Sequence, residues 1–473
     1  MTSNFIVDMK IKTFHRIVML YFILFFGVLA ITSLRYYYDE YAIYDIAYSL
    51  SYFGYGGLIL FLISCLKKDS DLSGKKVPLI MFSVFFILTA LSVVFSVDMF
   101  TAIYGNKGRY EGFLSILGYS GLFLTASILG SSRMKKIFSD VFVGFGTAYA
   151  ILGILQSISA LEKYIPSYYK IIRQRVEGYL ANGLTGSPVF LGALLTMLVA
   201  VSLSGLMYDD KRARKVLYGI SAVISIVCAF LTDVIQPLIG ISAAFITIGI
   251  IEVIKRKKFP EEKKKGILKS SLGSYSLIFT IGAIVTAAML LTGEAKLQDK
   301  SVIYEDSFYR AYVTGDQNAK DNGNIYLHMQ SEGLDIIKDN PIFGAGPDCI
   351  TRKLYMTPSS SDTSVEGNPD AEIILLLPAG SIDRPYNEYL YIAMSRGIPC
   401  LLAYLAFLFF TLKKGFSKVG GFFKKNEEWT AVAFTVAVVA YLVQAFVSMS
   451  DVSVAPFFWI MLGFILTKKK AEE

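Results

Sequence analysis

The feature that most constrains this chain is a series of long apolar blocks separated by short charged pieces. Each block has roughly 17–25 residues, which as a helix is enough to cross the ~30 Å hydrocarbon core of a bilayer. Only 18% of the residues are charged, whereas a soluble domain has about 25%. A transmembrane β-barrel would instead show alternating segments of about ten residues. The pattern therefore predicts an all-α polytopic membrane protein.

The apolar blocks predict about twelve transmembrane helices. Their approximate bounds are 17–34, 43–66, 77–97, 112–130, 137–160, 184–207, 216–232, 234–254, 267–292, 386–412, 429–449 and 452–467. One long polar loop separates the ninth helix from the tenth. The predicted organisation is therefore helices 1–9 over residues 1–292, the loop over 293–385, and helices 10–12 with a tail over 386–473.

The distribution of Lys and Arg predicts how the chain is oriented. Alternate loops hold most of the 46 basic residues, and cytoplasmic loops of membrane proteins carry such an excess. This places both termini in the cytoplasm and the long loop on the outer face. The net charge of +8 is then explained by basic loops facing the anionic inner leaflet. The expected partners are membrane lipids and not nucleic acid.

Cysteine and histidine are too scattered to predict a metal site. The four cysteines form no CxxC pair, and the two histidines, His15 and His328, are far apart. Disulfide frameworks and zinc sites need closer and more regular spacing. The sequence therefore predicts neither a metal nor another cofactor.

One segment of the long loop has helical character. Residues 325–339 carry apolar side chains at helical spacing, which predicts an amphipathic helix lying on the bundle. Pro341 is expected to end this helix, and the glycine-rich residues 344–347 to form a turn.

Three loops on the predicted outer face carry charged and amide side chains directly before a helix that runs inward. These residues are Asn106, Lys107, Arg109 and Glu111; Arg173, Arg175, Glu177 and Asn182; and Asp383, Arg384, Asn387 and Glu388. Arginine binds phosphate with paired hydrogen bonds, and a carboxylate can accept a proton. The loops therefore indicate a shared polar site. Alternatively, the arginines anchor the helices at the interface, and Glu111 and Glu177 pair with Arg109 and Arg175.

Three segments of the chain resemble the O-antigen ligase and O-antigen polymerase superfamily of bacterial membrane proteins. They are RVEGYLANGLTGSPVFLG at 175–192, IIKDNPIFGAGPD at 336–348 and IDRPYNEYLYIAMSRGIPCLLAYL at 382–405. A fourth segment, YGNKGRYEGFLSILGY at 104–119, is a weaker match. The order of elements, with one large outer loop late in the chain, is also similar to that family.

The resemblance implies a glycosyltransferase on the outer face of the bacterial cytoplasmic membrane. Such a protein would pass a glycan from an undecaprenyl-diphosphate carrier to a hydroxyl acceptor: a lipid, a glycan, a wall polymer or a protein. No metal is implied, since fixed cations can stabilise the departing diphosphate. By resemblance, Arg175 would bind the diphosphate. Location adds Lys107, Arg109, Asn182 and Arg384 as further substrate-binding candidates.

The sequence departs from the family at three polar positions. Tyr386 stands where the family has a histidine, although Asn387 and Glu388 remain. A tyrosine with a pKa of about 10 is a poor base, but it can donate a hydrogen bond to a phosphate or orient an acceptor. We therefore expect Glu388 or Asp383 to serve as the base, with Tyr386 and Asn387 beside it. The other two departures are Ile235 and Asn324, at positions where the family has arginine.

These departures leave three functions open. The chain is an active ligase or polymerase, an inactive relative that binds lipid-linked glycan or scaffolds polysaccharide assembly, or a transporter of lipid-linked oligosaccharides. A transporter is expected to carry ionisable residues in the middle of its spans. The apolar blocks have few of them, which favours chemistry at the membrane surface.

Overall fold

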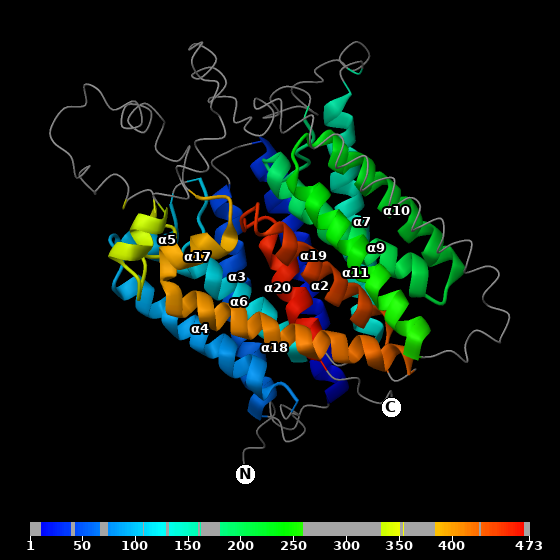
Figure 1. Ribbon diagram of the computed structural model, residues 1–473, viewed down its shortest axis with the longest axis horizontal. Helices are drawn as coiled ribbons and strands as arrows, with labels where there is room; N and C mark the ends of the chain where they lie inside the picture. Colours follow the sequence, from blue (N-terminus) through cyan, green and yellow to red (C-terminus); the bar gives the residue numbers. More distant parts are fainter. Residues whose placement is uncertain are drawn as a thin grey trace. The chain divides into compact units, whose positions relative to one another are not determined.

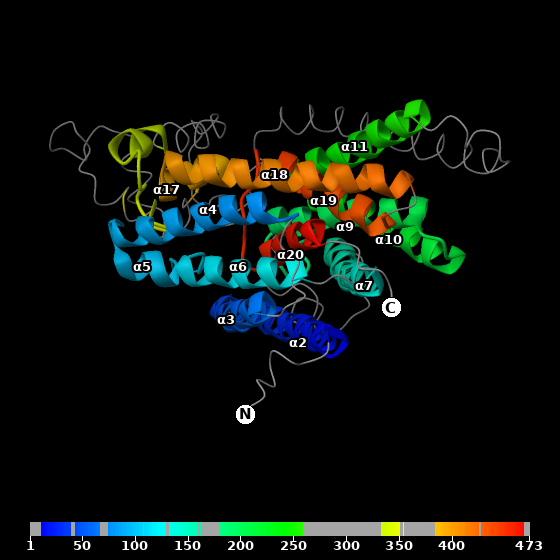
Figure 2. The same cartoon turned by 90° about the horizontal axis from the view of Figure 1, so that it is seen from below.

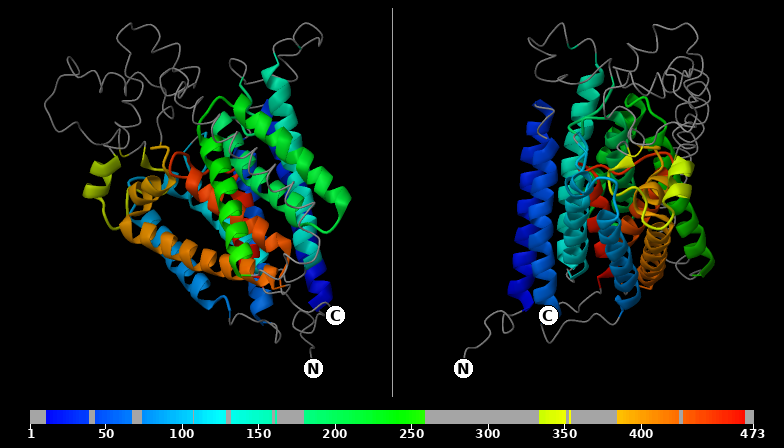
Figure 3. Two further views of the ribbon diagram at one scale, coloured as in Figure 1. Left: turned by 45° about the vertical axis from the view of Figure 1, so that its right-hand side comes forward. Right: turned by 90° about the vertical axis from the view of Figure 1, so that its left-hand side faces the viewer.

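The computed structural model describes residues 11–38, 43–66, 74–106, 108–128, 132–158, 161, 180–258, 333–350, 353, 384–424 and 427–467. Over these residues the regular secondary structure is helical, with no strand, which confirms the predicted all-α class (Figures 1 and 3). The number of twelve spans and the place of the long loop stay predictions. The predicted ninth span, 267–292, lies outside the described residues.

Eight described helices are long and apolar enough to cross a membrane. They are α2 (Ile11–Tyr38), α3 (Ile43–Leu66), α4 (Lys76–Val94), α7 (Ser132–Ser157), α9 (Pro188–Tyr208), α10 (Arg212–Leu231), α11 (Gln236–Lys258) and α18 (Ile398–Phe423). Three shorter apolar helices, α6 (Phe113–Ile128), α19 (Trp429–Gln444) and α20 (Ala455–Leu466), occupy further predicted spans. The chain is a multi-pass membrane protein.

The predicted bounds differ from the helices at several places; α18, for example, runs to Phe423 and not to residue 412. The tenth span is not continuous: α17 (Glu388–Arg396) and α18 are separated at Gly397, whose φ of 84° lies in the left-handed region. The helix α19 ends at Gln444 and not at residue 449, and α20 begins at Ala455 and not at residue 452. The physical reason is that the chain between them forms a loop whose backbone carbonyls bind other segments, as described below.

The chain divides into two compact units. Unit 1 comprises Met1–Thr125, Asp306–Thr411 and Ala445–Pro456, and unit 2 comprises Ala126–Glu305, Leu412–Gln444 and Phe457–Glu473. Each unit thus combines segments that are far apart in the sequence, and the predicted division at residues 292 and 385 remains a prediction.

In unit 1, glycines allow α3 and α6 to pack backbone against backbone. A Cβ placed on Gly54 would lie 2.4 Å from the Cα of Gly118, and one on Gly57 would lie 2.6 Å from the carbonyl oxygen of Gly121. The Thr125 hydroxyl donates to the Gly57 carbonyl at 2.9 Å. Small residues at such contacts are typical of membrane helices, because helices in lipid associate by close packing.

Aromatic side chains join α4, α6 and the first half of α18 within unit 1. The ring of Phe82 lies 4.6 Å from that of Phe123 and 5.4 Å from that of Phe407, and the ring of Phe85 lies 5.4 Å from that of Tyr404. Figure 2 shows α4 and α18 running alongside each other. These contacts hold α4 and α18 against α6, which begins two residues after Glu111.

Unit 2 is built around α9. Nearly every residue of this helix is buried, as expected of a helix that is apolar on all sides. The helices α7, α10, α11 and α19 pack against it (Figure 1). A tight turn at residues 232–235 joins α10 to α11, so the apolar region 216–254 forms two helices.

Candidate functional site

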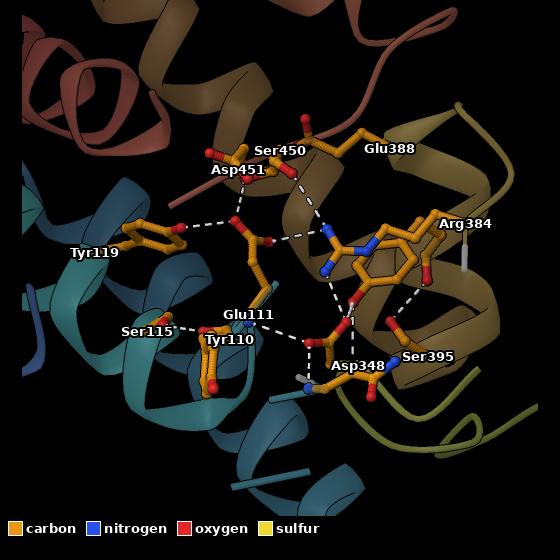
Figure 4. Close-up of polar contacts among 12 residues, drawn as sticks. Tyr110, Glu111, Ser115, Tyr119, Asp348, Arg384, Glu388, Ser395, Ser450 and Asp451 are labelled. Atoms are coloured by element: carbon orange, nitrogen blue, oxygen red, sulfur yellow. Dashed lines mark hydrogen bonds and ion pairs between the residues drawn. The ribbon is translucent and has the colours of Figure 1, made fainter. Parts of the chain in front are cut away.

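Arg384 is the centre of a buried polar cluster in unit 1. Its side chain is 1% exposed. One guanidinium nitrogen, Nη2, donates to Asp348 Oδ1 at 2.7 Å, and Nη1 donates to Glu111 Oε2 at 3.4 Å and to the Ser450 carbonyl at 3.2 Å (Figure 4). The guanidinium carbon also lies 4.5 Å from the centre of the Tyr391 ring. The charge of Arg384 is therefore bound by carboxylates of the chain itself.

Asp348 joins Arg384 to the loop that precedes α6. Its second oxygen, Oδ2, accepts hydrogen bonds from the backbone N–H groups of Asn106 at 2.7 Å and Glu111 at 3.2 Å. The backbone N–H of Asp348 in turn donates to the Tyr391 hydroxyl oxygen at 3.2 Å. A buried carboxylate needs such partners because its desolvation is costly. Asp348 thus joins its own segment to two others in unit 1.

Glu111 has partners on both of its carboxylate oxygens. Besides the bond from Arg384, its Oε1 accepts from the Tyr119 hydroxyl at 2.8 Å and from Ser450 Oγ at 3.3 Å. Burial raises the pKa of Glu111, and the nearby charge of Arg384 opposes that rise. Glu111 thus pairs with Arg384 from another of the predicted polar loops, while the alternative pairing of Glu111 with Arg109 stays a prediction.

Asp451 adds a third carboxyl group to this cluster. It is 2% exposed, and its Oδ1 accepts from the N–H and the hydroxyl of Ser453 at 2.9 Å and 2.5 Å. Burial raises the pKa of Asp451, while the Ser453 hydrogen bonds and the charges of Arg109 and Arg384 lower it. Arg109 and Arg384 therefore both act on one carboxyl group, and carboxylates outnumber arginines in this part of the site.

The two most specific family-like segments meet in space at α17. The backbone N–H groups of Ala345 and Gly346 donate to the carbonyls of Met394 at 2.9 Å and Ser395 at 2.8 Å, at the end of that helix. Gly346 has a φ of 105°, and a Cβ there would lie 2.3 Å from the Cβ of Ser96. The GAGPD turn expected from the sequence is present, and glycine is needed in it.

The helical part of the preceding segment is also present where the structure describes it. Residues 333–339 are helical, and Ile336 packs against Tyr391 and Met394, whereas Leu334 is exposed. The helix ends before Pro341, as predicted. The first half of the predicted amphipathic helix, 325–332, lies outside the described residues.

The start of α17 carries the candidate catalytic residues. Tyr386 has a φ of 46°, in the left-handed region. Asn387 caps α17, since its Oδ1 accepts from the N–H groups of Tyr389 and Leu390, both at 3.1 Å. Glu388 is 7% exposed, its backbone N–H donates to the Ala445 carbonyl at 2.9 Å, and its Oε1 accepts from the Tyr404 hydroxyl at 3.3 Å. Asp383 lies outside the described residues.

The remaining predicted site residues fall into two groups. Asn182 belongs to unit 2, is buried, and its backbone N–H donates to Gln156 Oε1 at 3.1 Å. Lys107 and Arg175 lie outside the described residues. Whether any of these side chains binds a substrate stays a prediction.

The sequence did not single out Asp348, Ser450 or Asp451. Asp348 ends the family-like GAGPD segment, so that motif was the available signal. Ser450 and Asp451 follow an apolar block with no motif around them, and only their contacts identify them. Within the described residues, no group of three or more His, Cys, Asp or Glu side chains is arranged to hold a metal ion.

The helices define a multi-pass helical membrane protein. A buried cluster of charged side chains around Arg384 lies where several of its loops meet. A family model described as O-antigen ligase matches residues 184–405, which include the GAGPD segment, Arg384 and α17. The match confirms the resemblance to the O-antigen ligase superfamily, and it indicates a membrane glycosyltransferase of polysaccharide assembly. A comparison with curated proteins finds no match to this chain.

Proposed function

We propose that this protein transfers a glycan from an undecaprenyl-diphosphate donor to a hydroxyl acceptor on the outer face of the bacterial cytoplasmic membrane. The observation that carries the proposal is that the GAGPD segment meets the end of α17 and, through Asp348, also Arg384 just before the start of that helix, all inside the matched family region. We further propose that both termini are cytoplasmic, as the basic loops indicate.

In the proposed reaction, the acceptor oxygen attacks the anomeric carbon of the donor glycan. The bond from that carbon to the diphosphate oxygen breaks, and the undecaprenyl diphosphate leaves with the electron pair. The proton of the acceptor hydroxyl passes to a carboxylate, for which Glu388 and Asp383 are the candidates. Tyr386 would donate a hydrogen bond, and Asn387 would hold the start of α17 in place.

The departing diphosphate needs cations. We propose Lys107, Arg109 and Arg175 for this role, since guanidinium and ammonium groups stabilise phosphate charge without a metal. Arg384 is a weaker candidate for the same role. Its donors are bound to Glu111 and Asp348, and a diphosphate placed there would face both carboxylates.

A transfer assay in membranes with a lipid-linked glycan donor tests the proposal. The native chain is compared with Glu388→Gln and Tyr386→His. Transfer by the native chain that is abolished by Glu388→Gln supports the proposed site. Transfer by Tyr386→His alone identifies the native chain as an inactive relative and overturns the proposal.

A further inference from the structure

The chain around the candidate catalytic residues is attached at both ends to the same loop. Arg384 donates to the Ser450 carbonyl, and four residues later the Glu388 N–H donates to the Ala445 carbonyl. The rings of Tyr389 and Phe446 add a contact, with 4.5 Å between their centres. Residues 384–388 therefore form a short bridge that can shift only if one of these attachments gives way.

Arg384 is the charged attachment of this bridge. Its guanidinium lies between Glu111 and Asp348, and each of the three side chains is no more than 3% exposed. Figure 4 shows Glu111 and Asp348 reaching the guanidinium from different segments. Removing one member would leave an uncompensated buried charge, so each member depends on the other two.

The attachment is directional as well as strong. Arg384 uses Nη1 and Nη2 toward separate acceptors, which a planar guanidinium can do and a lysine ammonium cannot reproduce with the same geometry. Only Pro385 separates Arg384 from Tyr386, and a proline ring fixes φ. The backbone between Arg384 and Tyr386 therefore has little freedom, so that holding Arg384 in place restricts the position of Tyr386.

We propose that Glu111, Asp348 and Arg384 are positioning residues that set the geometry of Tyr386, Asn387 and Glu388. This inference rests on the proposed function for the chemistry that those three residues perform. The cluster then has a role beyond holding the fold, because the carboxylates that pair with Arg384 also fix the chain at the start of α17. In this role the cluster acts by placing Glu388 and needs no contact with the substrate.

The first test measures position without any activity. Tyr386, which is partly exposed, is replaced by cysteine in a chain carrying Cys65→Ser, and the rate of maleimide labelling is measured in membranes. We expect Glu111→Gln and Asp348→Asn to change this rate by about tenfold, because they release the bridge. The matched control is Asp335→Asn, which breaks the exposed Lys338–Asp335 pair of the same unit and should leave the rate unchanged.

The second test is kinetic. Glu111→Gln should lower kcat on the order of 100-fold with little change in the donor KM, since misplacing a catalytic group by about 1 Å has that effect. The double variant Glu111→Gln with Glu388→Gln should be no slower than Glu388→Gln alone, because both changes act through one carboxylate. Arg384→Lys should also lose activity, because an ammonium group cannot bind the separate acceptors of the guanidinium in the same geometry.

The outcomes separate the two proposals. An unchanged labelling rate in Glu111→Gln and Asp348→Asn overturns the positioning role, as do independent, additive losses in the double variant. If Glu111→Gln and Asp348→Asn change the labelling rate but the native chain transfers no glycan, the proposed function is overturned and the positioning role stands. If the charge variants do not fold, Tyr119→Phe, which removes only one hydrogen bond to Glu111, replaces them and should give a smaller change of the same kind.

Discussion

Arg384 and Asp348 are 36 positions apart in the chain, and 2.7 Å separates Nη2 of the one from Oδ1 of the other. Both side chains are almost completely buried. A pair in this setting differs from a surface ion pair, since water cannot compensate for the loss of either member.

Asp348→Asn should destabilise the protein by about 3 kcal/mol, because it leaves the Arg384 charge with one carboxylate fewer in a buried site. The free energy of unfolding in mixed detergent micelles measures this loss. Asp335→Asn is the control, since an exposed pair such as Lys338–Asp335 contributes at most about 1 kcal/mol. Equal losses in the two variants would show that the Arg384 cluster is not buried.

The stability of the protein should fall as the pH rises from mildly acidic values. Glu111 and Asp451 have pKa values raised above 4.5 and 3.8, so the folded state binds protons more tightly than the unfolded state. Their contribution is complete below those ordinary values and is lost as the pH rises through the raised ones. The apparent Tm, measured in detergent over this pH range, should depend less steeply on pH in Asp451→Asn than in the native chain. An unaltered slope would contradict the raised pKa of Asp451.

Close packing of α3 against α6 should make their glycines intolerant of a methyl group. Gly118→Ala would place a Cβ 2.6 Å from Leu50 Cγ and 2.8 Å from the Leu50 carbonyl oxygen. Overpacking of this kind costs about 1–3 kcal/mol. Gly27→Ala in α2 is the control, because a Cβ there meets nothing within 4 Å and alanine favours the helix by about 1 kcal/mol. In the same measurement, Gly118→Ala should lower the free energy of unfolding and Gly27→Ala should raise it.

Tyr386→His should fold as well as the native chain. Residue 386 has a positive φ of 46°, and histidine enters that left-handed region more often than most residues do. Tyr386→Gly should be more stable than Tyr386→Ala, since only glycine adopts such a φ without cost. The apparent Tm of purified protein ranks the variants. A large loss in Tyr386→His would mean that the tyrosine ring, and not the backbone, holds this position.

The sequence supported the architecture because membrane helices have a simple signal. Apolar length alone located α2, α3 and most other helices, since lipid demands about 20 apolar residues for each crossing. It failed where helices are short or broken. The loop after Gln444 carries apolar residues, and its backbone groups are used by Arg384 and Glu388, which hydropathy does not detect.

The candidate site was only partly predictable. Local motifs marked the GAGPD turn, Arg384 and the start of α17, because turn glycines and helix caps follow from a few neighbouring residues. Glu111 was marked as part of a shared polar site, but its pairing with Arg384 was not, and neither were Asp348 and Ser450. Whether an arginine binds a substrate anion or the carboxylates of its own chain depends on which distant segments meet it.

By itself, then, the sequence determined that this is an all-α multi-pass membrane protein with polar loops of the O-antigen ligase type. Only the tertiary structure decided that Glu111, Asp348 and Asp451 gather at Arg384. Helix formation depends on neighbours a few residues away, whereas ion pairing depends on distance and burial. Both of these are properties of the folded chain.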